Sequence, residues 1–395
     1  MDDLNQALDL WLSRGVAAIL PDAGALKAKL LKEKIKVYTG VDPTGASLHI
    51  GHLIPLRKLA GLQKMGHQII FLIGDFTAMI GDPTDKLATR KQLTREEVLA
   101  NCAGYKDQLR GLIDFEGPNA AQLLFNSEWL SKLTFADVVE LSAHFTVQQM
   151  MERDMFEKRW QAEKPIGLHE FMYPLMQGYD SVAMGVDLEI GGNDQTFNML
   201  AGRALLKDYA GREKFVMTTK LLADESGKKM GKTEGNMIAL SDSPEDMYGK
   251  IMGWTDGMIL PGFELLTDVS PADLENMRQA MLSGENPMAF KKKLALSLVE
   301  SLRGAEAGQK AADYFTRVHG AGQLPEEIEV LKVPAGASII EVLVASGAVL
   351  SKNDARRQVE QSAVKVDSQT VTDSAFVPKS GQVIQKGKHF FVRLA

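Results

Sequence analysis

Two histidines three residues apart open an apolar helical pattern, directly after a turn rich in glycine. Residues 35–38 are mostly β-branched or aromatic and precede a turn from Gly40 to Gly45, which predicts a short strand that ends there. After His49 and His52, leucine recurs with helical spacing at positions 53, 56, 59 and 62. A helix that begins here directs free backbone N–H groups at the turn, and such an N-terminus suits a phosphate. Gly51, between the histidines, lets a flat ligand approach the backbone closely.

A second group of polar side chains shares one face of a predicted helix. Tyr173, Gln177 and Asp180 are four and three residues apart, so they lie on the same side. Their neighbours are apolar, which argues against a solvent-exposed face. A phenol, an amide and a carboxylate together are suited to a small polar zwitterion. A predicted strand over 186–190 follows, and it ends in two glycines and the polar residues 193–195.

Two polar loops carry pairs of cations. Residues 82–90 contain Lys86 and Arg90, and residues 227–233 contain Lys229 and Lys232. Taken alone, each pattern indicates no more than a solvated basic turn.

The elements that must position these side chains follow from periodicity. Residues 68–73 form a near-continuous apolar run, typical of a parallel strand covered on both faces. With the strand before Gly40 and the helix between, this gives a right-handed βαβ unit whose ligand lies beyond the strand carboxyl ends. Residues 1–33, 94–116 and 127–163 read as helical, the first with an apolar stripe at Leu4, Leu8, Trp11 and Leu12. We therefore predict an α/β fold with a Rossmann-like parallel sheet.

The composition sets further limits. A chain of 395 residues with 45% hydrophobic and 24% charged residues predicts a globular protein of two or three domains. No apolar run is long enough to cross a membrane, and the acidic start lacks the basic region of a signal peptide. A single cysteine, Cys102, excludes an internal disulfide and a cysteine-cluster metal site. We expect a cytoplasmic protein with no protein-bound structural metal.

The charge is unevenly distributed. The net charge is −6, but residues 335–395 hold eight Lys/Arg and five Asp/Glu, so this tail carries +3 and the remainder −9. A nucleic-acid partner would therefore be held locally rather than across the whole surface.

The motifs together resemble a known family. The string Gly-x-Asp-Pro-Thr-x-x-x-Leu-His-x-Gly-His from Gly40 to His52 resembles the nucleotide signature of the tyrosyl-tRNA synthetases, which are class I aminoacyl-tRNA synthetases. The stretch from Gly227 to Thr233 is similar to their Lys-Met-Ser-Lys-Ser loop, with Gly231 and Thr233 at the serine positions. The resemblance covers nearly the whole chain and implies a bacterial-type enzyme.

The resemblance also implies roles for residues. Lys86 and Arg90 would hold the pyrophosphate leaving group, and Asp194 would bind the ribose. The implied catalytic residues are Thr44, His49, His52, Lys86, Arg90, Lys229, Lys232 and Thr233. The implied ATP contacts are Gly40, Asp42, His49, Gly51, His52, Gly192, Asp194 and Lys232. Two positions depart from the family pattern, Asp85 for Gly and Glu189 for Gln, and their roles stay open.

For the amino acid, the site must bind the one hydroxyl that separates tyrosine from phenylalanine, because an apolar pocket discriminates weakly. Tyr38 and Asp180 suit that hydroxyl. Asp82, Tyr173 and Gln177 would hold the ammonium group, and Gln195 would lie near the carboxylate.

The same resemblance divides the chain into a catalytic domain (1–240), a helical anticodon-side domain (241–324), a linker (325–336) and a small RNA-binding module (337–395). The sequence pattern agrees with a helical domain that starts near residue 241, because Ser243 is a typical N-cap residue and Pro244 a typical first-turn residue of a helix. In the module, Arg356, Arg357 and Lys365 are the candidate tRNA contacts. The Met-rich stretch within 127–163 corresponds to the region that joins two subunits in this family, so we expect a homodimer.

The expected reaction is a tyrosine–tRNA ligation: tyrosine and ATP, with Mg²⁺, give tyrosyl-adenylate and pyrophosphate, and tyrosine is then transferred to the 3′ ribose of tRNA(Tyr). Three alternatives stay open: a tryptophan-specific relative, a small nucleotidyltransferase, and a synthetase-like RNA-binding or splicing protein without ligase activity.

Overall fold

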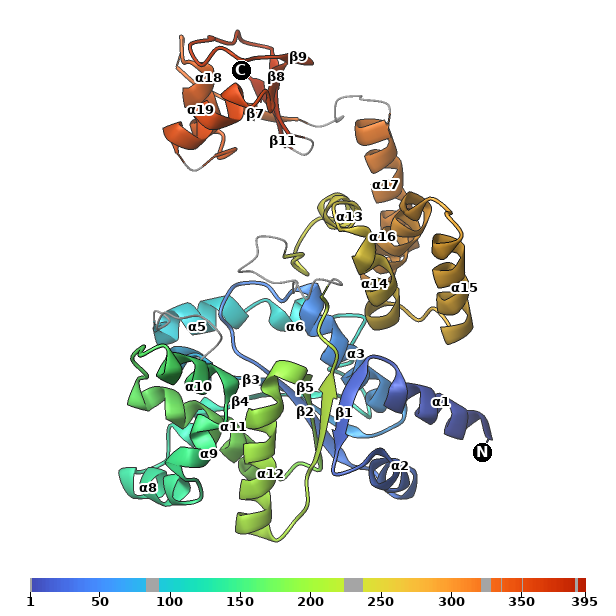
Figure 1. Cartoon of the computed structure of the whole chain (residues 1–395), viewed down its shortest axis with the longest axis vertical. Helices are drawn as coiled ribbons and strands as arrows, with labels where there is room; N and C mark the ends of the chain where they lie inside the picture. The colour runs from blue at the N-terminus through green and yellow to red at the C-terminus, as the bar shows by residue number, and fades with distance from the viewer. Residues whose placement is uncertain are drawn as a thin grey trace.

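The computed structural model describes residues 2–82, 92–223, 237–320, 328–334, 336–349, 351–387 and 390–395 (Figure 1). Its largest sheet has six strands in the order β1-β6-β5-β2-β3-β4. They are β1 (Val16–Leu20), β2 (Lys36–Val41), β3 (Gln68–Ile73), β4 (Gln122–Phe125), β5 (Leu188–Gly192) and β6 (Phe215–Thr219). Neighbours pair in parallel except β1, which runs antiparallel to β6. The predicted parallel-sheet α/β fold is confirmed, with an antiparallel edge strand added.

The order in which the chain adds strands to the sheet reverses between β2 and β5. From β2 the sheet grows through β3 to β4, whereas from β5 it grows the other way to β6. Ligands of such sheets bind outside the carboxyl ends at this switch point. The register places Tyr38 of β2 opposite Glu189 of β5, so both side chains lie on the same face of the sheet.

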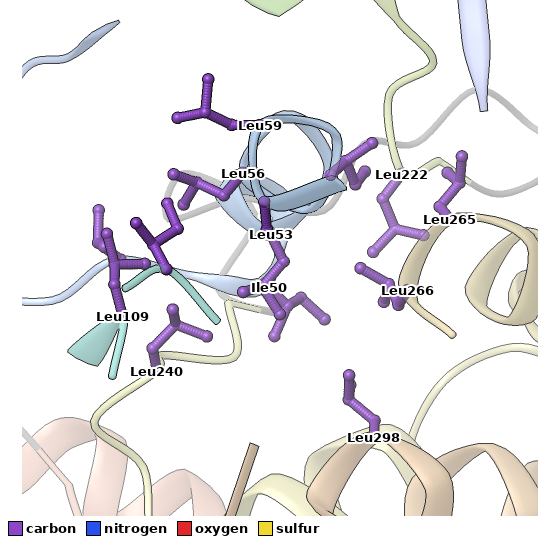
Figure 2. Close-up of a cluster of buried hydrophobic side chains, with 14 of the residues drawn as sticks. Ile50, Leu53, Leu56, Leu59, Leu109, Leu222, Leu240, Leu265, Leu266 and Leu298 are labelled. Carbon is purple, nitrogen blue, oxygen red and sulfur yellow. The ribbon is translucent and has the colours of Figure 1, made fainter. Parts of the chain in front are cut away.

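Helix α3 (Ile50–Lys64) follows β2, and His49 is its N-cap residue. Figure 2 shows its apolar side chains Ile50, Leu53, Leu56 and Leu59 in one buried cluster with leucines of α14 (Ile259–Leu266) and α16 (Pro287–Arg303). All belong to one hydrophobic core that continues from the sheet into the helical region. The signature helix is therefore held between the sheet and the later helices.

The other helices before β6 are α1 (Asp2–Ser13), α2 (Ala23–Lys32), α4 (Thr77–Ile80), α5 (Arg95–Cys102), α6 (Tyr105–Gln108), α7 (Ser127–Leu130), α8 (Phe135–Ala143), α9 (Val147–Met151), α10 (Asp154–Gln161), α11 (Leu168–Met184) and α12 (Thr196–Ala210). The helical region continues with α13 (Pro244–Met252), α15 (Pro271–Leu282) and α17 (Ala305–Phe315). None of the helices in the described part of the chain is long and apolar enough to cross a bilayer.

The C-terminal region has its own sheet, in the order β7-β11-β10-β8-β9, and its own apolar core. Its strands are β7 (Glu329–Leu331), β8 (Val364–Val366), β9 (Gln369–Thr370), β10 (Val383–Lys386) and β11 (Phe390–Leu394), and its helices are α18 (Ile339–Ala345) and α19 (Lys352–Glu360). In Figure 1 this module lies beyond the end of α17.

Three strands differ from the sequence expectation. β1 lies within residues 1–33, which read as helical, and β4 lies between two stretches that read as helices. β7 falls inside the interval predicted as linker and pairs in parallel with β11. Each of these strands has five residues or fewer, too short to produce a clear alternating pattern.

The buried position of α3 gives a stability prediction. Leu56 is fully buried, whereas Leu31 of α2 is 47% exposed. Leu56→Ala should lower the free energy of unfolding by about 2–5 kcal/mol, because it removes apolar contacts and leaves a cavity. Leu31→Ala is the matched control and should change it by roughly 0.5 kcal/mol or less. Urea unfolding followed by fluorescence measures both, and equal losses would contradict this packing.

Candidate active site

A cavity of about 400 Å³ opens at the carboxyl ends of β2 and β5. We call it the central cavity. It brings together every predicted site residue of the catalytic region that lies within the described residues. These are Tyr38, Gly40, Asp42, Thr44, His49, Gly51, His52, Asp82, Tyr173, Gln177, Asp180, Gly192, Asp194 and Gln195.

The N-terminus of α3 forms one wall of the cavity. The imidazole rings of His49 and His52 stack with centroids 3.8 Å apart. Burial lowers the pKa of His49, and burial with the neighbouring His49 lowers the pKa of His52 well below its usual range. Both rings are therefore neutral at pH 7. His52 Nδ1 accepts the backbone N–H of His49 at 3.1 Å, so its proton lies on Nε2, which can donate.

Gly51 leaves room for the His49 ring in this wall. A Cβ atom at Gly51 would lie 3.0 Å from the His49 ring. The absence of that atom allows the ring to lie against the first turn of the helix.

Asp42, at the end of β2, is held from two sides. It accepts hydrogen bonds from the Tyr173 hydroxyl at 2.8 Å and from the Thr77 hydroxyl at 2.7 Å. A Cβ at Gly74 would lie 2.1 Å from Asp42 Oδ1, so the residue that directly follows β3 must be a glycine. These contacts connect β2, α4 and α11 at one carboxylate.

Asp82 is the acceptor of a second polar cluster. It accepts from Arg153 Nη2 at 2.7 Å and from Gln195 Nε2 at 2.9 Å. The Gln195 carbonyl in turn accepts from Asn198 at 2.9 Å. Both polar atoms of the Gln195 side chain are thus engaged with protein groups, although the residue also lines the cavity.

Tyr38 and Asp180 also line the cavity, and both are nearly inaccessible to solvent. The Tyr38 hydroxyl lies 3.1 Å from Ser181 Oγ. Asp180 accepts from Trp129 Nε1 at 2.7 Å and from Asn126 Nδ2 at 3.2 Å. Burial raises the pKa of Asp180 well above the usual range, while these two N–H donors favour its charged form.

Glu189, whose role the sequence left open, forms a buried ion pair with Lys214. Its other oxygen accepts from Gln177 Nε2 at 3.0 Å. Because an ionised carboxylate only accepts hydrogen bonds, it fixes the orientation of the Gln177 amide. The Gln177 carbonyl oxygen is then left for a ligand that donates.

The predicted cations Lys86, Arg90, Lys229 and Lys232, with Thr233, lie outside the described residues. The chain on either side of the 224–236 segment is fixed beside the central cavity. Leu222 lines the cavity, and the Ile238 carbonyl accepts the N–H of Ile50 at 3.0 Å. Asp82 is the last described residue before the segment 83–91, and it also lines the cavity.

The predicted tRNA contacts lie in the C-terminal module. Arg356 and Arg357 are on α19 and Lys365 is on β8, and all three are exposed. Arg357 forms a surface ion pair with Asp354 at 2.6 Å.

Several site residues were not predicted from the sequence. Asn126, Trp129, Arg153 and Lys214 hold lining carboxylates, yet each comes from a region that gave no motif. Asn126 directly follows β4, so identifying that strand would have placed it at the ligand-binding edge. The described residues include no group of three or more His, Cys, Asp or Glu side chains that could hold a metal ion.

Comparison with known proteins agrees with this geometry. Residues 30–320 match the family described as tRNA synthetases class I (W and Y). The tyrosine–tRNA ligase of Moorella thermoacetica is 43% identical over 393 residues, which cover 97% of this chain and 94% of that protein. The ligase of Thermotoga maritima is 40% identical over 388 residues and covers 97% and 96%.

Solved structures give the same result for the fold. A C-terminally truncated mitochondrial tyrosyl-tRNA synthetase of Coccidioides posadasii is 25% identical with a TM-score of 0.62, over 78% of this chain and 91% of that one. The tyrosyl-tRNA synthetase of Archaeoglobus fulgidus, solved with L-tyrosine, is 23% identical with a TM-score of 0.62, over 78% and 100%. The chain belongs to the class I tRNA synthetases of the tryptophan and tyrosine group and, within that group, to the bacterial tyrosine–tRNA ligases.

Proposed function

We propose that the central cavity binds tyrosine and ATP, joins them into tyrosyl-adenylate with release of pyrophosphate, and supplies tyrosine to the 3′ ribose of tRNA(Tyr). The single observation that carries this proposal is that two different kinds of binding group line one cavity. The N-terminus of α3 provides neutral donors for phosphate, while Tyr38 and Asp180 provide a polar pair for a phenol.

The charge of the cavity supports an amino acid with its ammonium group held by carboxylates. Five carboxylates line it: Asp42, Asp82, Asp180, Glu189 and Asp194. Among the described lining residues, Lys220 is the one Lys or Arg, and it pairs with Glu264 at 2.8 Å. Asp82, Tyr173 and Gln177 are our proposed ammonium ligands, and Gln195 holds Asp82 in place.

The same acidity means that ATP needs added positive charge. We assign it to Lys86, Arg90, Lys229 and Lys232, with Thr233 as a further donor and with Mg²⁺ that enters bound to ATP. Lys229→Ala or Lys232→Ala should then slow adenylate formation in single-turnover assays while tyrosine affinity stays unchanged.

Chemically, the first step is a displacement at phosphorus. A carboxylate oxygen of tyrosine attacks the α-phosphorus, the bond to the bridging oxygen breaks, and pyrophosphate leaves. The tyrosine carboxylate is already ionised at pH 7, so no general base is required. The protein contributes by positioning the reactants and stabilising charge that develops on the phosphates. Thr44, His49 and His52 are the proposed groups on the α3 side, and Gly40, Gly51, Gly192 and Asp194 complete the ATP contacts.

In the second step a ribose hydroxyl of tRNA attacks the carbonyl carbon of the adenylate, and AMP leaves. We propose that residues 241–324 and the C-terminal module guide this tRNA. The module would bind it through Arg356, Arg357 and Lys365. Since β7 belongs to the sheet of the module, we now begin the module at 328. We place the reaction in the cytoplasm, which cell fractionation can test.

ATP–pyrophosphate exchange across the twenty amino acids, with and without Mg²⁺, tests this function. Exchange with tyrosine alone, dependent on Mg²⁺, is expected. Exchange with tryptophan would favour the tryptophan-specific alternative. Absence of exchange with any amino acid, together with intact RNA binding, would favour the RNA-binding alternative.

The α3 wall gives the first of four further predictions. His49→Ala should lower the rate of tyrosyl-adenylate formation by about 10²–10³, the size of the effect when one preorganised donor is lost. Tyrosine affinity should hardly change. The matched control is His144→Ala, because His144 pairs with Asp208 outside the cavity. Weakened tyrosine binding with an intact rate would place His49 at the amino acid instead.

The phenol end gives the second prediction. Tyr38→Phe should lower discrimination against phenylalanine by roughly tenfold, the effect of losing one hydrogen bond of about 0.5–1.5 kcal/mol. Asp180→Asn should lower it further, because an acceptor oxygen is replaced by an NH2 group that only donates. Tyr105→Phe is the control, since its hydroxyl donates to the Gly45 carbonyl at 2.7 Å outside the phenol site. Tyrosine and phenylalanine exchange rates measure the ratio, and unchanged ratios in both variants would remove these residues from the specificity site.

The separate core of the C-terminal module gives the third. A chain that ends at residue 320 should form adenylate at nearly the wild-type rate but charge tRNA poorly. The salt dependence of tRNA binding should also fall, because fewer cations meet phosphates. Filter binding at several salt concentrations measures this. Normal charging by the truncated chain would exclude a role for the module in recognition.

The surface of α8–α11 gives the fourth. Phe135, Val139, Val147, Trp160 and Leu168 are large apolar side chains that are all more than half exposed. We propose that this region joins two copies of the chain. Trp160→Glu should shift the protein towards monomer in sedimentation velocity at micromolar concentration. Leu282→Glu, at a comparably exposed site on α15, should not. A wild-type monomer would contradict the proposal.

A further inference from the structure

Lys214 is a buried cation behind the central cavity. Its side chain is fully inaccessible to solvent, and it is not among the lining residues. Nζ forms the ion pair with Glu189 and donates to Ser181 Oγ at 2.8 Å. Removing a cation from water is costly, and even a paired buried cation often stabilises a protein no more than an apolar side chain would. The presence of Lys214 at this position therefore needs an explanation other than packing.

Helix α12 leaves space for the contact between Lys214 and Ser181. A Cβ atom at Gly202 would lie 2.6 Å from Lys214 Nζ and 2.7 Å from Ser181 Oγ. The glycine therefore leaves the space in which the ammonium group and the hydroxyl meet.

The hydrogen-bond chemistry of Lys214 restricts its neighbours. An ammonium group only donates, so Ser181 Oγ must accept from it. The one proton of Ser181 then remains for its other contact, the Tyr38 hydroxyl at 3.1 Å. If Ser181 donates to Tyr38, the proton of Tyr38 is directed away from Ser181, where a ligand oxygen competes for it with the Glu189 carboxylate.

We propose that Lys214 and Ser181 are positioning residues for tyrosine recognition, which set the direction of the hydrogen bonds so that Tyr38 donates to the substrate hydroxyl. This inference rests on the proposed placement of tyrosine in the cavity. The order is Lys214 to Ser181, Ser181 to Tyr38, and Tyr38 to the substrate oxygen. The substrate hydroxyl then donates its own hydrogen bond to an Asp180 oxygen, which already accepts from Trp129 or Asn126.

The opposite direction would not match tyrosine. If Tyr38 donated to Ser181, Tyr38 and Asp180 would both present acceptors to a hydroxyl that has one proton. One of the two would then remain unpaired in a buried site, which is unfavourable. The fixed direction makes the site complementary to a hydroxyl and leaves two polar groups unpaired when phenylalanine enters.

Ser181→Ala tests this order of hydrogen bonds and leaves the Lys214–Glu189 ion pair in place. It should lower kcat/KM for tyrosine in pyrophosphate exchange by up to about tenfold, the range of one hydrogen bond, and leave the value for phenylalanine unchanged. In the Tyr38→Phe background, Ser181→Ala should cause no further loss, because it acts through the Tyr38 hydroxyl. A purely structural role would instead lower both substrates equally and add fully to Tyr38→Phe; either result would overturn the proposal.

A second variant removes the cation itself. The pair Lys214→Met with Glu189→Gln deletes both charges together, so no uncompensated charge is left buried. The tyrosine-to-phenylalanine ratio should fall as in Ser181→Ala. A folded double variant with the wild-type ratio would overturn the role of Lys214, and if this variant does not fold, Ser181→Ala decides.

These outcomes are distinct from a failure of the proposed function. If the wild-type chain shows no tyrosine-dependent exchange, or if Tyr38→Phe leaves the ratio unchanged, the placement of tyrosine fails. If the wild-type and Tyr38→Phe results are as expected and Ser181→Ala keeps the wild-type ratio, this inference alone fails.

Discussion

The parallel pairing of β2 with β5 is the constraint on which the rest of the site depends. This pairing sets Tyr38 beside Glu189 and brings the ends of both strands, at Asp42 and Gly192, to one edge. Because the order of the strands reverses there, α3 and the turn that follows β5 (residues 193–195) leave the sheet on either side of the cavity. A shift of one residue in this register would turn Tyr38 to the other face of the sheet.

Buried charge is the main energetic difficulty of such a site, and the structure meets it with specific partners. Asp82 has Arg153, Glu189 has Lys214, and Asp180 has two neutral N–H donors. Each of these carboxylates therefore has a protein donor before any ligand arrives, which fixes its position, and keeps further acceptor capacity for the ligand. Pre-positioned acceptors bind a ligand with less loss of side-chain entropy than flexible ones.

How much of this could be predicted depended on whether the signal was local. The turn before α3 and the polar face of α11 are short-range patterns, so Thr44, His49, Tyr173 and Asp180 could be placed from the sequence. Lys214 could not, because it stands in a polar stretch that resembles a solvated turn. Only the pairing of β5 with β6 brings it to Glu189, 25 residues away. Asn126 was missed because β4 has four residues, too few for a recognisable period.

The described cavity and the predicted phosphate-binding residues differ in charge and in place along the chain. Carboxylates attached to the sheet, to α11 and to the adjoining turns line the cavity, whereas the candidate cations for ATP lie in the segments 83–91 and 224–236. This division orients a zwitterion: its ammonium group is attracted to the carboxylates, so its carboxylate points towards the phosphate side, where it must attack. Neutral imidazoles on α3 fit the same logic. A charged histidine pair would attract the substrate carboxylate and the phosphates alike, whereas neutral N–H donors stabilise phosphate oxygens through direction, and the cations needed for the departing pyrophosphate come with ATP and the two segments.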